Sequence, residues 1–197
     1  MKSLSPEEIE RLFSGSLSVK DRKQISVEGY HSAGVLVPII VNSEGSELLF
    51  TKRTEQVETH KGQVSFPGGM ADSRDVDIVH TALREAWEEV GIPASFITVI
   101  GMLDDLPTPT GFVITPVVGI INNMPPLAPN PDEVAEVFHV PLSFFATPSA
   151  GRSEPREFRG KYHEVWFYEH EGHTIWGVTA IIVRSLLARL NLLETST

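Results

Sequence analysis

Residues 68–92 read Gly-Gly-Met-Ala-Asp-Ser-Arg-Asp-Val-Asp-Ile-Val-His-Thr-Ala-Leu-Arg-Glu-Ala-Trp-Glu-Glu-Val-Gly-Ile, the most informative part of the sequence. A glycine pair opens it, an acidic turn follows, and the second half has the periodicity of an amphipathic helix. The apolar stripe of that helix consists of Val79, Ala82, Leu83, Ala86 and Val90. Gly91 is the residue type that ends a helix in a left-handed C-cap, and Pro93 prevents the helix from continuing. The stretch therefore predicts a helix with one buried face.

Three carboxylates crowd a neighbouring face of the same helix. Glu85, Glu88 and Glu89 are spaced i, i+3 and i+4, so they lie together. Such like charges destabilise a helix by roughly 0.2–0.5 kcal/mol per pair, and Arg84 offsets part of this by pairing with Glu88. Mg²⁺ or Mn²⁺ would turn the repulsion into attraction, because both cations prefer oxygen ligands. The alternative is a solvated acidic face, the usual meaning of a charge cluster.

The second half of the stretch resembles the Nudix box, Gly-x5-Glu-x7-Arg-Glu-U-x-Glu-Glu-x-Gly-U, in which U is aliphatic. The matching residues are Arg84, Glu85, Glu88, Glu89, Gly91 and Ile92, with Ala86 at the first U position. A chance match of the five charged and glycine positions is expected on the order of once in ten thousand chains of this length.

The first half of the stretch departs from that pattern. Counting back from Arg84 places Met70 at the expected glycine and Val76 at the expected glutamate. One extra loop residue brings Gly69 to the glycine position, and Asp75 or Asp77 then replaces the glutamate. This longer acidic loop resembles the coenzyme A pyrophosphatase branch of the Nudix hydrolases.

Residues 49–69 resemble the same branch, whose pattern is approximately Leu-Leu-Thr-x-Thr/Ser-Ser/Ala-x3-Arg-x3-Gly-x3-Phe-Pro-Gly-Gly. The residues in register are Leu49, Thr51, Gly62, Phe66, Pro67, Gly68 and Gly69; the departures are Phe50, Arg53, Thr54 and Glu58. Glu58 stands where an arginine is expected and would repel a phosphate such as the 3′-phosphate of coenzyme A, unless it is simply a surface residue. Lys52, Arg53 and Lys61 are nearby cations that would substitute.

The resemblance implies an α/β fold, the Nudix α/β/α sandwich with a mixed sheet, in residues 33–197, preceded by an N-terminal helical extension over residues 1–32. The element pattern alone indicates only a mixed α/β protein. The expected strands are 33–40, 47–53, 96–103, 112–121, 163–168 and 173–176, and the expected helices are a short one with Ser5 as N-cap and a final one over 177–193. Pro38 predicts an edge or a bulge, and Pro116 predicts a break. Residues 151–161 are expected to form an irregular loop.

The resemblance also implies a metal-dependent site. Glu85, Glu88, Glu89 and the Gly69 carbonyl would hold Mg²⁺ or Mn²⁺, and a metal-activated water would attack one phosphorus. The simpler interpretation of Gly69 is a tight turn after a strand, which is compatible with a metal contact. Arg84 would orient the glutamates. The expected accessory acid or base is Glu133, with Glu136 second, although both fit solvated surface acids. The candidates for substrate contact are Arg53, His60, Gly62, Phe66 and Gly68.

Composition limits the function classes. The chain has 197 residues, a net charge of −10 and no cysteine, which argues against nucleic-acid binding and against disulfides. Neither an apolar run of 18 residues nor an N-terminal apolar signal core is present. We therefore expect a cytoplasmic protein with a small-molecule nucleotide as its partner and no membrane; the resemblance implies a homodimer, because family members often pair.

The expected activity is hydrolysis of coenzyme A or its thioesters to 3′,5′-ADP and 4′-phosphopantetheine or its acyl form. Another Nudix activity, on ADP-ribose, NADH, dinucleoside polyphosphates or capped RNA, is the first alternative, because of Glu58. A non-catalytic Nudix-like binding module is an alternative of another class. Such a module is expected to have lost the glutamates of the Nudix box, whereas Glu85, Glu88 and Glu89 are all present.

Overall fold

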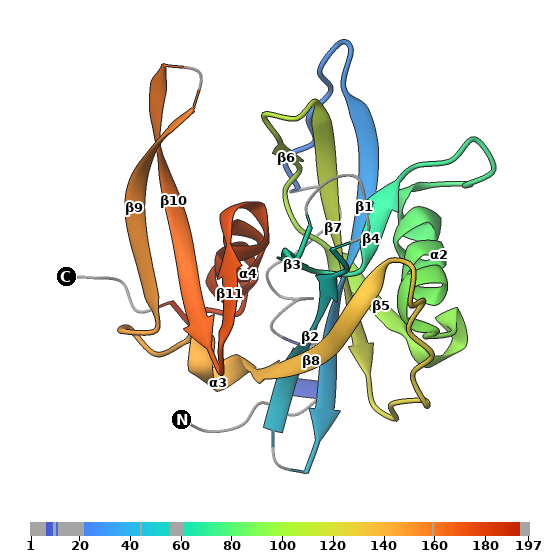
Figure 1. The fold of residues 1–197 in the computed structure, drawn as a ribbon. Helices are drawn as coiled ribbons and strands as arrows, with labels where there is room; N and C mark the ends of the chain where they lie inside the picture. Colours follow the sequence, from blue (N-terminus) through green and yellow to red (C-terminus); the bar gives the residue numbers. More distant parts are fainter. Residues whose placement is uncertain are drawn as a thin grey trace.

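The computed structural model describes residues 7–9, 11, 22–43, 45–55, 61–158 and 160–193. Within these ranges, eight strands form a mixed sheet at the centre of the molecule (Figure 1). They are β1 (His31–Asn42), β2 (Gly45–Arg53), β3 (Val64–Ser65), β4 (Gly68–Met70), β5 (Thr98–Met102), β6 (Leu106–Pro107), β7 (Phe112–Ile121) and β8 (Val134–Pro141). The hydrogen-bonded path runs β3-β2-β1-β7-β5, while β4 pairs with β1, β6 with β7 and β8 with β2.

Strands β1 and β7 form the buried middle of this sheet. They pair in parallel from His31 and Phe112 to Ile40 and Ile121. Both are nearly continuous apolar runs, which is typical of strands covered on both faces. The strands expected over 33–40, 47–53 and 112–121 are therefore present as β1, β2 and β7.

Two prolines lie inside central strands, so the predictions of an edge or bulge at Pro38 and of a break at Pro116 were wrong. β1 pairs with β4 before Pro38 and with β2 after it, while β7 remains paired along its opposite side. β7 pairs with β6 before Pro116 and with β5 after it. A proline lacks only its own backbone N–H. Because Pro38 and Pro116 each lie where one partner strand ends and the next begins, few hydrogen bonds of the sheet are lost.

Two long helices, α2 (Ile78–Val90) and α4 (Gly177–Arg189), cover opposite faces of the sheet (Figure 1). Alternation along β1 supplies both interfaces: Leu36 and Ile40 belong to the apolar cluster under α2, and Val37 and Ile39 to the cluster under α4. Two short helical segments lie in connections: η1 (Ala94–Phe96) between α2 and β5, and α3 (Leu142–Phe145) between β8 and β9. The expected α/β/α sandwich is confirmed.

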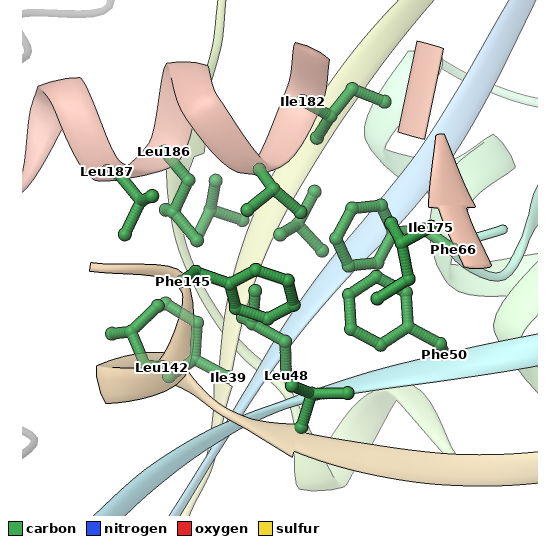
Figure 2. Close-up of a cluster of buried hydrophobic side chains, with 14 of the residues drawn as sticks. Ile39, Leu48, Phe50, Phe66, Leu142, Phe145, Ile175, Ile182, Leu186 and Leu187 are labelled. Atoms are coloured by element: carbon green, nitrogen blue, oxygen red, sulfur yellow. The ribbon is translucent and has the colours of Figure 1, made fainter. Parts of the chain in front are cut away.

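The cluster under α4 is the larger one and fixes the segment that leads into the glycine pair (Figure 2). The ring of Phe66, only 3% exposed, stacks on Phe50 with 4.6 Å between the ring centroids. Leu186 and Leu187 of α4 are fully buried in the same cluster. Each such side chain contributes about 1.5–3 kcal/mol of burial, so the position of the turn after Phe66 is strongly determined.

A second sheet of three strands packs beside α4: β9 (Gly151–Phe158), β10 (Lys161–His170) and β11 (His173–Trp176), in the order β11-β10-β9. The strands expected over 163–168 and 173–176 are confirmed, but the expected loop over 151–161 is instead β9 and its turn into β10. The charges of this strand suggested a loop, yet Arg152, Glu154 and Arg156 lie on one side of it and pair with one another.

The described part of the N-terminal region is helical at Glu7–Ile9 and Arg11. Ile9 is fully buried in the cluster under α4, so this segment packs on the domain as expected. The predicted N-cap Ser5 lies outside the described residues, as do Glu58 and His60. Among the described residues, no helix is long and apolar enough to cross a membrane.

Candidate active site

Helix α2 has the C-terminal end and the faces that its sequence predicts. Its N-cap is Asp77, whose Oδ1 accepts from the His80 N–H at 2.8 Å. Its C-cap is Gly91, with φ of 75°. Ala82, Ala86 and Val90 are fully buried against the sheet. This orientation leaves the carboxylate face directed toward β4 and the loop before β8.

Arg84 is the centre of the acidic cluster, and all of its guanidinium nitrogens are used. Nε and Nη2 donate to the two carboxylate oxygens of Asp75, each at 3.0 Å. Nη1 donates to Glu85 at 2.7 Å and to Glu88 at 2.8 Å. Nη2 also donates to the Met70 carbonyl at 3.1 Å. The salt bridges expected of Arg84 are present, and they tie the helix to β4 and to the acidic loop.

Asp75, rather than Asp77, pairs with Arg84. The Asp75 side chain is 2% exposed and also accepts from Thr81 Oγ1 at 2.9 Å. These donors, Arg84 above all, hold the pKa of Asp75 far below its usual range. Because Asp77 is occupied as the N-cap, the structure resolves the choice between the two aspartates that the sequence left open.

Glu89 is the most deeply buried of the three glutamates. It is 3% exposed, and within the described ranges its Oε2 has no hydrogen-bond partner. Burial raises the pKa of Glu89 to about 8, although Arg53 and the Gly68 N–H act in the opposite direction. A cation lies nearby: Arg53 Nη1 is 3.7 Å from Glu89 Oε1. A buried carboxyl oxygen without a partner is costly and is suited to receive a cation.

Glu85 lies directly against Gly69. A Cβ added to Gly69 would come within 2.6 Å of the Glu85 carboxylate, so the glycine lets this carboxylate approach β4 in its present position. Burial also raises the pKa of Glu85, with Arg84 acting against it. The backbone of β4 therefore lies directly beside a carboxylate of α2, and a metal contact of the Gly69 carbonyl stays a prediction.

These donors fit a hard divalent cation. The partly buried carboxylate of Glu85 lies near the buried carboxylate of Glu89, and the latter has an oxygen with no hydrogen-bond partner among the described residues. Oxygen donors of this kind suit Mg²⁺ and Mn²⁺. In the described ranges, however, no three acidic or histidine side chains are arranged to hold a metal together. We attribute the lack of a third ligand to Glu88, because its half-exposed carboxylate is bonded to Arg84.

Glu133 reaches the cluster from the loop between β7 and β8. Its negative charge raises the pKa of both Glu85 and Glu89, and its carbonyl accepts from the Thr54 N–H at 3.0 Å. Glu136 is placed differently: it lies opposite Lys52 in the β2–β8 pairing, and its Oε1 is 3.1 Å from His173 Nε2. The structure therefore brings Glu133, and not Glu136, to the box glutamates.

Of the residues predicted to contact substrate, two lie at the acidic cluster and two others lie elsewhere. Arg53 and Gly68 lie at the acidic cluster, and Gly62, with φ of 64°, forms a turn beside Glu55. Phe66 is buried in the core, so its side chain is not available for the predicted contact with substrate. The sequence reading missed Asn130 and Thr54, whose contacts are largely made by backbone groups and carry no spacing signal.

Comparisons with known proteins agree with this fold. The family model of the NUDIX domain matches residues 31–171. A protein of Photorhabdus laumondii named "Uncharacterized Nudix hydrolase NudL" is 43% identical over 83% of this chain and 87% of its own length. A protein of the same name from Cronobacter sakazakii is 39% identical over 94% of this chain and 96% of its own length. A solved Nudix hydrolase of M. smegmatis, RenU, has a TM-score of 0.50 at 24% identity, covering 59% of this chain and 74% of its own.

Proposed function

Because this chain belongs to the Nudix hydrolase family, whose members are pyrophosphatases, we propose that it hydrolyses the diphosphate linkage of coenzyme A or its thioesters. The products are 3′,5′-ADP and 4′-phosphopantetheine or its acyl form. The proposal for the substrate rests on one observation, the register of Leu49, Thr51, Gly62 and the segment 66–69 with the coenzyme A branch.

The proposed metal ligands are Glu85, Glu88, Glu89 and the Gly69 carbonyl. Mg²⁺ or Mn²⁺ bound there would supply charge neutralisation for the diphosphate and would acidify water. The unpartnered oxygen of Glu89 and the contact of Glu85 with Gly69 support this assignment. For Glu88, it requires the half-exposed side chain to leave Arg84.

The protein's own side chains have separate tasks in this proposal. Arg84 holds the acidic face in place through Asp75 and the glutamates. Glu133 is the proposed base, since its charge lies beside the glutamates but its side chain is not tied to Arg84. Arg53, 25% exposed beside Glu89, is positioned to contact a substrate phosphate. A carboxylate acting as base typically contributes about 10²–10⁴-fold to the rate.

One observation favours a second candidate within the same family. Glu58 occupies the position where the coenzyme A branch has an arginine, and a carboxylate repels the 3′-phosphate. Hydrolysis of ADP-ribose, NADH, dinucleoside polyphosphates or capped RNA is therefore the alternative.

The test is an incubation of the protein with coenzyme A and Mg²⁺ or Mn²⁺, with products resolved by chromatography. Dephospho-coenzyme A, ADP-ribose and NADH serve as parallel substrates. We expect release of 3′,5′-ADP, with dephospho-coenzyme A clearly slower because it lacks the 3′-phosphate. Turnover of ADP-ribose or NADH with coenzyme A intact would refute the proposed substrate and leave the site assignment standing.

A further inference from the structure

Asn130 makes an unusual number of hydrogen bonds for a loop residue. Its N–H donates to the Glu89 carbonyl at 2.9 Å, and its own carbonyl accepts from the N–H groups of Glu133 at 3.1 Å and Val134 at 2.8 Å. Its side-chain Oδ1 accepts from the Asp132 N–H at 3.1 Å, and its Nδ2 donates to Glu133 Oε1 at 3.2 Å. One residue therefore joins the backbone of a box glutamate to the carboxylate of Glu133.

The loop that carries Asn130 is docked on the end of α2. The carbonyls of the last helical turn have no partner within a helix, and here two of them accept from this loop: Val90 from the Ala128 N–H at 3.0 Å, and Glu89 from Asn130. Gly91 permits the approach, because a Cβ there would lie 2.9 Å from the Ala128 side chain. The loop therefore caps the helix that carries the three glutamates.

The sequence around Asn130 restricts its conformation. Pro129 and Pro131 flank it; each has a fixed φ, and Pro131 also keeps Asn130 out of the helical region. Little conformational entropy is then left for this segment to lose on ordering. Thr54 holds the far side of the segment, since its Oγ1 donates to the Asp132 carbonyl at 3.1 Å.

We propose that Asn130 is a positioning residue, whose side-chain amide orients the Glu133 carboxylate toward the glutamates of α2 for the hydrolytic reaction. This inference rests on the proposed role of Glu133 in the proposed function. It extends that function because it names a residue whose side chain touches neither metal nor substrate and affects the reaction through Glu133.

The kinetic test is a double-mutant cycle of Asn130→Asp and Glu133→Gln. Aspartate retains the acceptor for the Asp132 N–H but removes the donor to Glu133. We expect Asn130→Asp to lower kcat roughly 10–100-fold, the usual effect of an outer-shell partner, with KM changed less than about threefold. In the Glu133→Gln background, the same substitution should change kcat less than about twofold.

Three outcomes of the cycle would overturn the inference: unchanged kcat in Asn130→Asp, unchanged kcat in Glu133→Gln, or an equal fall in both backgrounds, which would mean a merely structural role. Asn122→Ala is the matched control, because Asn122 is an exposed asparagine of the same loop. The cycle is run on whichever substrate of the panel is hydrolysed, so rejection of coenzyme A alone does not affect it.

A measurement without turnover tests the hydrogen bond itself. The side-chain NH₂ signals of Asn130 in a ¹⁵N–¹H spectrum are assigned by their loss in Asn130→Asp. We expect them to shift in Glu133→Ala and to remain in place in Glu136→Ala, since Glu136 contacts His173 instead. If Glu133→Ala leaves them unmoved, the inference is wrong even when the proposed activity is found; if the protein hydrolyses none of the substrates, this spectrum still decides whether Asn130 holds Glu133.

Discussion

At the scale of single residues, the pair of Asp75 and Arg84 determines how the acidic face is held. Asp75→Asn keeps the shape of the side chain but removes the charge from a site that is 2% exposed. Breaking a buried pair in this way typically costs about 3–5 kcal/mol. Arg84 also orients Glu85 and Glu88, so we expect turnover to fall about 10–100-fold. Urea unfolding and steady-state kinetics measure the two effects.

Asp77→Asn is the matched control for this substitution. Asparagine is as good an N-cap as aspartate, and Asp77 contacts His80 rather than Arg84. We expect a change in stability within about 0.5 kcal/mol and nearly normal turnover. Equal effects of the two substitutions would mean that Asp75 has no special role.

Glu89 gives a prediction in which stability and activity separate. Burial keeps the pKa of Glu89 near 8 without metal, so at pH 7 the folded protein holds a neutral carboxyl group there. Glu89→Gln replaces it with a neutral amide, and the metal-free protein should be as stable as wild type within about 1 kcal/mol. Turnover should nevertheless fall by about three orders of magnitude, because a proposed metal ligand is lost. Retention of wild-type turnover would refute the metal assignment.

The sequence predicts part of this site because helical spacing is a strong signal. The glutamates and Arg84 could be placed on one face from their spacing alone, and Gly91 from the helix end. Spacing could not choose between Asp75 and Asp77, since a loop of uncertain length precedes the helix. Asn130 was missed because three of its five hydrogen bonds are made by its own backbone, which any residue type except proline could provide.

At the scale of elements, the end of α2 and the loop before β8 act as one unit. Gly91 has φ of 75°, and a Cβ would meet Ala128 at 2.9 Å. Gly91→Ala therefore incurs the left-handed penalty of roughly 1–2 kcal/mol and also displaces the loop that carries Glu133. We expect a loss of about 2–4 kcal/mol together with reduced kcat, measured by thermal unfolding and kinetics.

Gly111→Ala separates the two contributions. Gly111 has φ of 87°, but a Cβ there would meet nothing within 4 Å. This substitution should cost only the backbone penalty of roughly 1–2 kcal/mol, with kcat unchanged. If Gly91→Ala loses no more unfolding free energy than Gly111→Ala and retains full activity, docking of the loop on α2 contributes neither to stability nor to turnover.

The strands were predictable where burial makes a continuous apolar run, as in β1 and β7. The predictions at Pro38 and Pro116 were wrong because the rule that places proline at sheet edges assumes one partner strand along each side of a strand. Here β1 and β7 each pair with two successive strands along one side. β9 was missed because its charged side chains pair with one another along the strand, and such pairing is invisible in a hydrophobic pattern.

At the scale of the whole molecule, the raised pKa of Glu89 couples folding to pH and to metal. The folded protein binds this proton up to about pH 8, whereas the unfolded chain releases it near pH 4.3. Between these values the folded state holds more protons, so its stability is greatest at the acidic end and falls as the pH rises. We expect the metal-free protein to lose roughly 2–4 kcal/mol of unfolding free energy between pH 5 and 8, a loss that Glu89→Gln should lack.

Added Mg²⁺ should oppose this trend, because the cation takes the place of the proton on the carboxylate. The stabilisation by Mg²⁺, measured as the shift in Tm between EDTA and Mg²⁺ buffers, should therefore grow from pH 6 to pH 8 in wild type. The matching control is Glu136→Gln, since Glu136 pairs with His173 outside the cluster and should leave the trend intact. A Tm shift that is equal at both pH values, or that persists fully in Glu89→Gln, would place the cation elsewhere. The repulsion among the carboxylates of α2 would then be offset by Arg84 and not by a bound cation.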